Sequence, residues 1–296
     1  MANARALDKR RKSVRNIRKI TRTMELIATA CFKKAMDRAM AATAYTDRIT
    51  QMVSDLAQSG LELNHPLLET RETTDNATLL VLTANRGLCG GYNGNMLRSA
   101  LPRRKELTEQ FENLQMEVSG RRGIAGLRYR GIEIDETYTQ FNDQPKYEEV
   151  EPIANRFLDM FRLGQIDRLD VVYTRFISVS RQQAVVETLL PLGSISENDG
   201  QQTQQGSGTQ SSFEFIPSAE SILEEVVPES FRVRLFKCFL DAAVSEQVSR
   251  MVAMKSATEN ASDMIKQLSM TYNRARQSQI TNEIMEIIGG VEALSG

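Results

Sequence analysis

Apolar residues recur at helical spacing through two long segments near the ends of the chain. Residues 1–59 and residues 229–288 contain neither glycine nor proline, the two residues that most often interrupt helices. A stripe of apolar and small residues that steps by threes and fours runs through the second segment at Val244, Val248, Met251, Met254, Thr258, Ala261, Ile265, Leu268, Tyr272 and Ala275. A similar stripe in the first segment contains Val14, Ile17, Ile20, Met24, Ile27, Cys31 and Ala35. The spacing predicts two long helices.

The length of these helices predicts that they pair with each other. At about 1.5 Å per residue, each runs for about 80–90 Å. A domain of the roughly 140 residues between them has a radius of gyration of about 14 Å and cannot cover either helix along its length. Since this domain separates them in the chain, we expect an antiparallel pair. Pro228 is expected near the start of the second helix, and Gly289 and Gly290 are expected to end or kink it.

The middle of the chain changes to an alternation of strand and helix patterns. Helical patterns at 94–114 and 148–166 separate short apolar runs, which predicts a partly parallel sheet with helical cover in a Rossmann-like α/β domain. The predicted strands are 77–82, 115–120, 131–138, 168–178 and 182–192.

Composition then suggests where the domains end. Residues 194–212 are rich in Gln, Ser and Gly and nearly free of apolar side chains, which predicts a flexible loop. Apolar alternation resumes at 213–217. We therefore expect an N-terminal coiled-coil helix (1–60), an α/β domain (75–193), a polar loop with a following short segment (194–217) and a C-terminal coiled-coil helix (218–296).

Charge and cysteine content exclude several classes of protein. The net charge is −1, but residues 1–38 hold twelve basic and three acidic residues. The three cysteines are far apart and the only histidine is His65, which argues against a zinc site and suits a reducing compartment. No apolar stretch reaches the roughly 20 residues of a membrane span, and no secretory signal is visible. The basic start could also be read as a mitochondrial transit peptide, although it carries a regular apolar stripe.

A glycine-rich stretch, "RGLCGGYNGN" at 86–95, follows the first predicted strand and raises the question of a phosphate site. A P-loop requires a lysine and a hydroxyl residue directly after its last glycine, but the next basic residue here is Arg98. The GxGxxG pattern of dinucleotide sites is also absent. We interpret Gly87, Gly90 and Gly91 as a structural turn; anion binding at the following helix start is the alternative. No catalytic residue, metal or cofactor is expected.

Four stretches of the sequence resemble the gamma subunits of F-type, proton-translocating ATP synthases. They are "SVRNIRKITRTMELIATACFKKA" (13–35), "TANRGLCGGYN" (83–93), the long stretch 245–288 and, overlapping its end, "ITNEIMEIIGG" (280–290). The resemblance covers essentially the whole chain. Two positions depart from the family pattern, namely Ala84-Asn85 in the glycine turn and Val291 after the signature. The 194–212 loop contains no cysteine, which argues against the thiol control of chloroplast members.

The resemblance implies a rotating central stalk. In this family the helix pair stands inside a ring of three alpha and three beta subunits. The α/β domain rests on the c-ring beside the epsilon subunit, and proton flow turns the shaft to drive ATP synthesis or hydrolysis at the beta subunits. The implied protein is non-catalytic, binds no cofactor and no nucleic acid, and lies peripherally on the cytoplasmic side of a bacterial plasma membrane.

The resemblance also implies which residues make subunit contacts. The apolar end of the C-terminal helix, called the tip here, is expected to turn against an apolar surface inside the ring of alpha and beta subunits. The alternative is that the tip folds back onto the α/β domain. Below the tip, a basic and amide cluster is expected to contact beta, and Met24, Lys33 and Lys34 are expected to face an acidic segment of beta. The alternative for each single charged residue is that it lies on a solvated helix face and makes no subunit contact. Phe213, Glu214 and Phe215 are expected at the foot on the c-ring and epsilon. The cluster and tip residues are Arg274, Arg276, Gln277, Ile280, Thr281, Glu283, Ile284, Met285, Ile287, Ile288, Val291 and Leu294.

Two other classes of function remain open from the residues alone. A nucleotide-binding enzyme with helical arms would bind ATP tightly at residues 87–95. A coiled-coil scaffold that binds nucleic acid through its basic start would show salt-sensitive binding.

Overall fold

The computed structural model describes residues 4–58, 66–67, 74–141, 144–192 and 219–295. His65, the 194–217 segment and the expected foot residues Phe213, Glu214 and Phe215 lie outside these ranges. The chain divides into two compact units. We call the described residues of 30–249 the sheet unit, and those of 1–29 and 250–296 the terminal helix unit.

A five-stranded sheet forms the centre of the sheet unit. Strand β1 (Asn76–Leu82) pairs in parallel with β2 (Asn113–Ser119) on one side and with β4 (Arg168–Ser178) on the other. Strand β3 (Glu136–Tyr138) adds to β2 in parallel, and β5 (Arg181–Leu190) adds to β4 as an antiparallel hairpin. The resulting order, β3-β2-β1-β4-β5, confirms the predicted partly parallel sheet.

Helices connect and cover the strands. The connecting helices are α2 (Tyr92–Gln110), α3 (Arg121–Arg128) and α4 (Tyr147–Arg162). The terminal segments form α1 (Ala4–Gln58) and α6 (Ala219–Ser295), helices of 55 and 77 residues. Both are far longer than the average globular helix of about 11–12 residues, as the lack of glycine and proline predicts.

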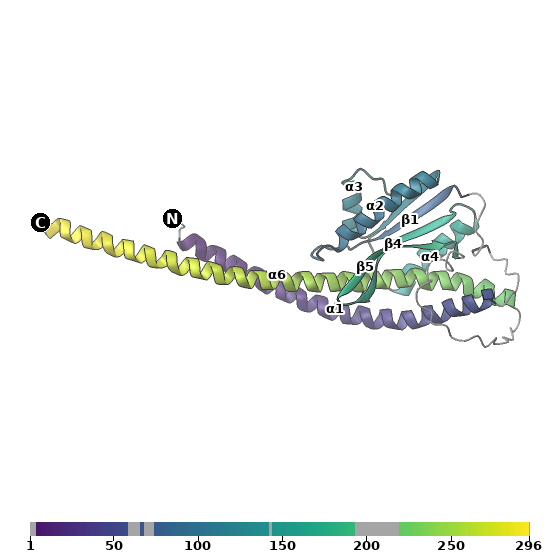
Figure 1. Ribbon diagram of the computed structural model, residues 1–296, viewed down its shortest axis with the longest axis horizontal. Coiled ribbons are helices and arrows are strands. Elements are labelled where there is room, and N and C mark those ends of the chain that lie inside the picture. Colours follow the sequence, from purple (N-terminus) through teal and green to yellow (C-terminus); the bar gives the residue numbers. More distant parts are fainter. Residues whose placement is uncertain (1–3, 59–65, 68–73, 142–143, 193–218, 296) are drawn as a thin grey trace. The chain divides into compact units, whose positions relative to one another are not determined.

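Helices α2 and α3 cover one face of the sheet (Figure 1). Because alternate residues of a strand point to opposite faces, Leu79 and Val81 of β1 point into this layer. They pack with Val172 of β4, Met96 of α2 and Leu127 of α3, all of them fully buried. This layer is the smaller of the two cores beside the sheet.

Helices α4 and α6 cover the opposite face. Leu80 of β1 and Val171 of β4 pack there against Phe157 and Phe161 of α4 and Phe231 of α6. The first part of α6 is thus a core element of the sheet unit. In the same unit α1 also packs on α6, where a small cluster of its alanines meets α6 leucine and valine: Ala35, Ala39, Leu240 and Val244.

In the terminal helix unit, α1 and α6 form the predicted antiparallel pair. The hydroxyl of Thr258 donates a hydrogen bond to that of Thr21 at 2.8 Å. Ten residues earlier in α1, the guanidinium carbon of Arg11 lies 4.6 Å from the ring centre of Tyr272, fourteen residues later in α6. Since the numbers rise in one helix as they fall in the other, the two helices run in opposite directions.

The predicted stripe of α6 is confirmed as the packed side of that helix, and every one of its ten members is buried or half-buried. The predicted stripe of α1 is wrong in part. Ile17, Ile20 and Ile27 are 49%, 55% and 58% exposed, whereas Glu25 and Ala28 are buried. The packed stripe is shifted by about one position toward small and polar side chains, which allow the two helix backbones to approach closely.

The expected ends of the C-terminal helix are also corrected. Pro228 lies inside α6, and the helix continues through Gly289 and Gly290. A proline in a helix removes one backbone hydrogen bond, but Val227 and Phe231 beside it are fully buried in the core, which holds this turn in place. Strand β3 is likewise shorter than the predicted 131–138.

Candidate coupling surfaces

The seam of the terminal helix unit contains small and polar side chains as well as apolar ones. Ala28 of α1 and Ala261 of α6 are 1% and 7% exposed. The oxygen of the Thr258 hydroxyl that bonds to Thr21 also lies 2.8 Å from the backbone oxygen of Met254, so its one proton is shared between the two acceptors. Polar pairs in a helix seam specify register at some expense of stability. The pattern therefore favours one defined alignment of the two helices.

A groove of about 420 Å³ opens where α1 begins beside α6. It brings together three of the predicted contact residues, Arg276, Ile280 and Glu283. The stacked Tyr272 forms part of its wall. Basic and acidic side chains of the first turns of α1 complete the lining: Arg5, Asp8, Lys9 and Lys12.

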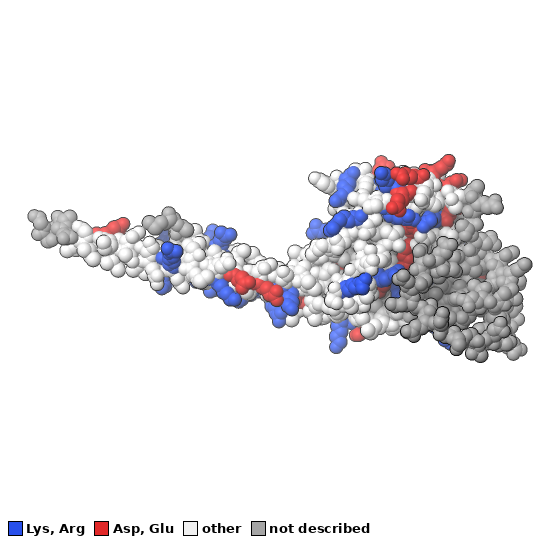
Figure 2. Space-filling model, viewed as in Figure 1, with Lys and Arg blue, Asp and Glu red and all other residues white. Residues whose placement is uncertain are grey.

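Beyond this groove α6 continues past Ala4, the first described residue of α1 (Figure 1). The large apolar side chains that the structure describes at this end are exposed, from 46% for Ile280 to 67% for Ile287. The side chain of Leu294, also predicted at the tip, lies outside the described ones. Figure 2 shows a largely uncharged surface over the described part of this end. Exposed apolar surface of this kind marks an interaction site. The other members are Ile284, Met285, Ile288 and Val291.

Five other predicted contact residues lie on exposed helix surface. Arg274 and Gln277 are exposed, and the Thr281 hydroxyl bonds within its own helix to the Gln277 backbone oxygen at 3.0 Å. Lys33 and Lys34 are exposed on the part of α1 that belongs to the sheet unit.

Met24 differs from these residues because it is half-buried against the seam. Sequence reasoning missed the Arg11–Tyr272 stack and the exposed isoleucines of α1. The exposed isoleucines were visible in the sequence as part of the apolar stripe of α1, but that stripe was predicted to face the partner helix.

The glycine-rich stretch forms a turn between β1 and α2. Gly90 has a φ of 55° and Leu88 a φ of 66°, while Gly91 is helical at the start of α2. A side chain at Gly87 would come within 2.9 Å of the Arg122 guanidinium. Gly90 therefore needs glycine for its backbone conformation, whereas a side chain at Gly87 would require only the flexible end of Arg122 to move.

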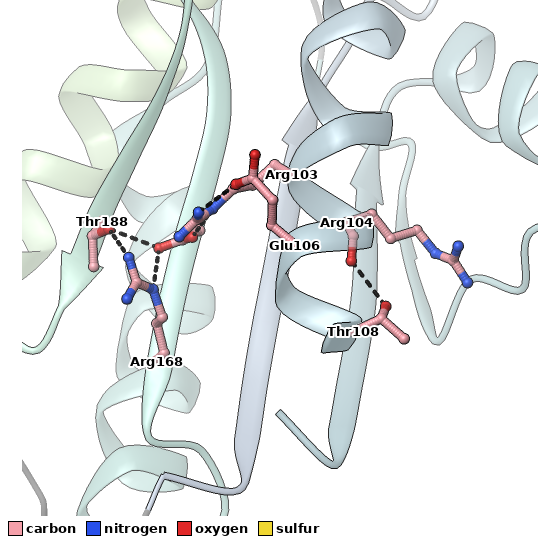
Figure 3. Close-up of polar contacts among 7 residues, drawn as sticks. Arg103, Arg104, Glu106, Thr108, Arg168 and Thr188 are labelled. Carbon is pink, nitrogen blue, oxygen red and sulfur yellow. Dashed lines mark hydrogen bonds and ion pairs between the residues drawn. The ribbon is translucent and has the colours of Figure 1, made fainter. Parts of the chain in front are cut away.

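The sheet unit contains carboxylates on its strands that are paired with arginine side chains of the sheet and its neighbouring helices. Asp170 of β4 is fully buried and accepts hydrogen bonds from Arg103 at 2.7 Å, from Arg168 at 3.0 Å and from the Thr188 hydroxyl at 2.8 Å (Figure 3). Arg103 also binds Glu106 at 2.7 Å. Both carboxylate oxygens of Asp170 are thus paired, which is the condition for a stable buried charge.

Two further carboxylates are held in the same way. Glu117 of β2 accepts hydrogen bonds from Arg156 at 2.6 and 2.7 Å and from Tyr138 at 2.7 Å. Glu187 of β5 is paired with Arg234 of α6 at 2.9 Å. Burial alone would raise the pKa of Glu187, but Arg234 and the neighbouring donors lower it below its usual value.

Asp241 of α6 yields a prediction for pH dependence. Burial raises its pKa from 3.8 to about 6, with Glu187 adding to the rise and Lys237 and Arg175 opposing it. The unfolded chain, with the lower pKa, binds fewer protons between pH 4 and 6, so stability falls as the pH rises through that range. The ionised carboxyl thereby costs about 3 kcal/mol at pH 7.

Asp241→Asn should therefore raise the free energy of unfolding at pH 7 by about 2–3 kcal/mol, and by much less at pH 4. Urea unfolding across this pH range measures the gap between variant and parent. Asp159→Asn, the same change on an exposed part of α4, is the control. A gap that does not widen with pH contradicts the assignment.

The described residues lack two other kinds of site. They contain no group of three or more His, Cys, Asp or Glu side chains placed to hold a metal ion. None of the helices in the same ranges is both long and apolar enough for a membrane span.

The fold and its surfaces define a class of protein in which paired N- and C-terminal helices carry a doubly wound α/β domain. Residues 3–294 match the family model described as ATP synthase. The chain belongs to this family, and the relatives below place it among the gamma chains.

Similar proteins match this chain over its full length. The chain is 67% identical over 296 residues to the ATP synthase gamma chain of Rhodopirellula baltica, with both chains covered completely. It is 40% identical to the ATP synthase gamma chain of Saccharopolyspora erythraea, covering all of this chain and 98% of the relative.

A solved structure shares the fold. A chain in the Euglena gracilis mitochondrial ATP synthase, described as OSCP/F1/c-ring in rotational state 3, matches with a TM-score of 0.66 and 17% identity. The match covers 98% of this chain and 94% of the other.

Proposed function

We propose that this chain is the rotating central stalk of a bacterial F-type ATP synthase. One copy turns inside a ring of three alpha and three beta subunits and couples proton flow through the c-ring to ATP synthesis or hydrolysis at beta. The chain itself is not catalytic. It contacts the epsilon subunit and the c-ring, and it lies peripherally on the cytoplasmic side of the plasma membrane.

The observation that carries this proposal is the antiparallel helix pair with an exposed apolar end. Helices α1 and α6 cover each other through a seam that contains small residues, and the described apolar side chains beyond the groove are exposed. Family membership supports the same role. Solved structures of similar fold belong to the rotor of the Euglena gracilis mitochondrial ATP synthase and to the central stalk and c-ring of the Tetrahymena thermophila one.

Co-purification tests the composition of the complex. An affinity tag on this chain should recover three alpha, three beta and one copy of the chain, quantified by native mass spectrometry. A nucleotide-binding enzyme is the competing function. Isothermal titration of the chain with Mg-ATP should detect no tight site, and micromolar binding at the glycine turn would favour the enzyme.

Arg276→Ala tests the groove as a coupling surface. Removing the guanidinium should lower ATP turnover of the assembled complex by about twofold or more, because a desolvated charge pair with a partner is lost. Steady-state ATP hydrolysis by the purified complex measures the effect. Lys105→Ala, on exposed helix surface of the sheet unit, is the control. Turnover equal to that of the parent would remove Arg276 from the contact surface.

A further inference from the structure

The order of strands reverses beside the centre of the sheet, the position at which open α/β sheets form a crevice. From β1 the chain adds β2 and β3 on one side and then crosses to β4 on the other. In open α/β sheets, ligands bind where the order reverses in this way, outside the carboxyl ends of the two strands concerned. Here those are β1 and β4, and the glycine turn follows the end of β1.

Helix α6 occupies this position in the sheet unit. The hydroxyl of Tyr92, the first residue of α2, donates a hydrogen bond to the backbone oxygen of Ala242 at 3.2 Å. The hydroxyl of Ser245 donates to the backbone oxygen of Thr174 in β4 at 3.1 Å. Both bonds are buried, and Val244 between them is fully buried. The two bonds thus tie one turn of α6 to the elements on both sides of the crevice.

The same elements are also connected to each other. The Thr174 hydroxyl lies 3.5 Å from the Met96 sulfur of α2 in a buried contact. Lower on α6, Arg234 is paired with Glu187 of β5. Arg234 and Ser245 are eleven residues apart, about three helical turns, so both lie on the same side of α6 about 16 Å apart along its axis. Two fixed points at this separation resist both rotation and sliding of the helix.

We propose that α6 takes the place of a ligand in this crevice, and that Tyr92 and Ser245 are positioning residues which lock the helix to the α/β domain so that torque passes between them. This proposal rests on the proposed function as a rotating stalk. The hydroxyls act through the backbone of α6 and β4, because a carbonyl oxygen already bonded within a helix or sheet retains a second lone pair. The lock is therefore independent of which side chains face the partner subunits.

The test uses the double variant Tyr92→Phe/Ser245→Ala in the complete complex. Each change removes one hydroxyl and keeps the packing volume nearly unchanged. ATP hydrolysis should stay close to that of the parent, because the surfaces facing alpha and beta are intact. In reconstituted vesicles, the protons pumped per ATP hydrolysed should fall by about twofold, since a looser lock lets α6 turn partly without the α/β domain.

A second measurement separates a positioning role from a structural one. With beta immobilised and a bead attached to the α/β domain, the angular fluctuation of the bead at a catalytic pause should widen by about 1.5-fold in the double variant. The single variants should each show a smaller effect. The matched control is Tyr129→Phe/Ser256→Ala, which removes the same two hydroxyls at exposed positions.

The outcomes are distinguishable. If the parent complex assembles and pumps, but the double variant shows the parental pumping ratio and fluctuation, the lock is refuted and the stalk function stands. If the parent chain does not assemble with alpha and beta at all, the proposed function itself fails. Loss of pumping together with equal loss of hydrolysis also counts against the lock, because it indicates general damage.

Discussion

Asp170→Asn is expected to lower the free energy of unfolding of the sheet unit by about 3 kcal/mol, the typical result of removing one partner of a buried ion pair. The asparagine keeps the size of the side chain but loses its charge. The positive charges of Arg103 and Arg168 then lie on either side of a neutral, buried side chain of β4 and have lost their shared negative partner. Hydrogen exchange of β1 and β4 amides should become about 100-fold faster, the equivalent of that free energy.

The position of Asp170 makes this effect larger than that of either arginine. Asp170 is fully buried, whereas the side chains of Arg103 and Arg168 are 19% and 31% exposed and regain water when left alone. Arg103→Met should accordingly cost less than Asp170→Asn. Asp159→Asn on exposed α4 surface is the control for the loss of a negative charge. A change below about 1 kcal/mol in Asp170→Asn would mean that the pairs barely exceed their desolvation cost.

The fold followed from the sequence where an apolar pattern is regular and clearly bounded. The strand at 168–178 was predicted with the bounds that β4 has, because its apolar run is bounded by polar turns. The stripe of α6 was predicted correctly because its spacing follows one side of a helix and that side is packed. In α1 the isoleucines at 17, 20 and 27 form an equally regular stripe, yet they are exposed. Periodicity identifies an apolar side, but it does not say whether that side meets the partner helix or another protein.

The candidate surfaces could be predicted only in part, because they depend on pairs distant in sequence. The tip and the Arg276 cluster came from a contiguous stretch that resembles a family signature. The hydrogen bond from Tyr92 to Ala242 joins residues 150 positions apart, and nothing local marks either one. Asp170 and Arg103 are likewise 67 positions apart. Such contacts follow from strand order and helix placement, which the local pattern leaves open.

Deleting residues 285–296 is expected to lower coupled ATP synthesis of the assembled complex several-fold while the isolated chain keeps its fold. Ile287 and Ile288 are 67% and 54% exposed, so their removal takes little apolar burial from the chain itself. In a complex they would be covered by the surrounding subunits. Burying each such side chain contributes about 1.5–3 kcal/mol to the free energy of association. ATP synthesis in energised vesicles measures the first outcome, and hydrogen exchange of the isolated chain measures the second.

A length-preserving variant separates loss of apolar contact from loss of helix stiffness. A side chain added at Gly289 or Gly290 meets no atom within 4 Å in the chain, so Gly289→Ala/Gly290→Ala should stabilise this part of α6 by about 1 kcal/mol per residue. This variant keeps every isoleucine, and we expect it to sustain ATP synthesis if the apolar surface is what the surrounding subunits require. Reduced protection of the α/β domain in the truncated chain would instead identify the tip as part of the core. Apolar side chains left exposed at the end of a long helix are unfavourable in water, and contact with a partner surface is the physical reason for a sequence to retain them.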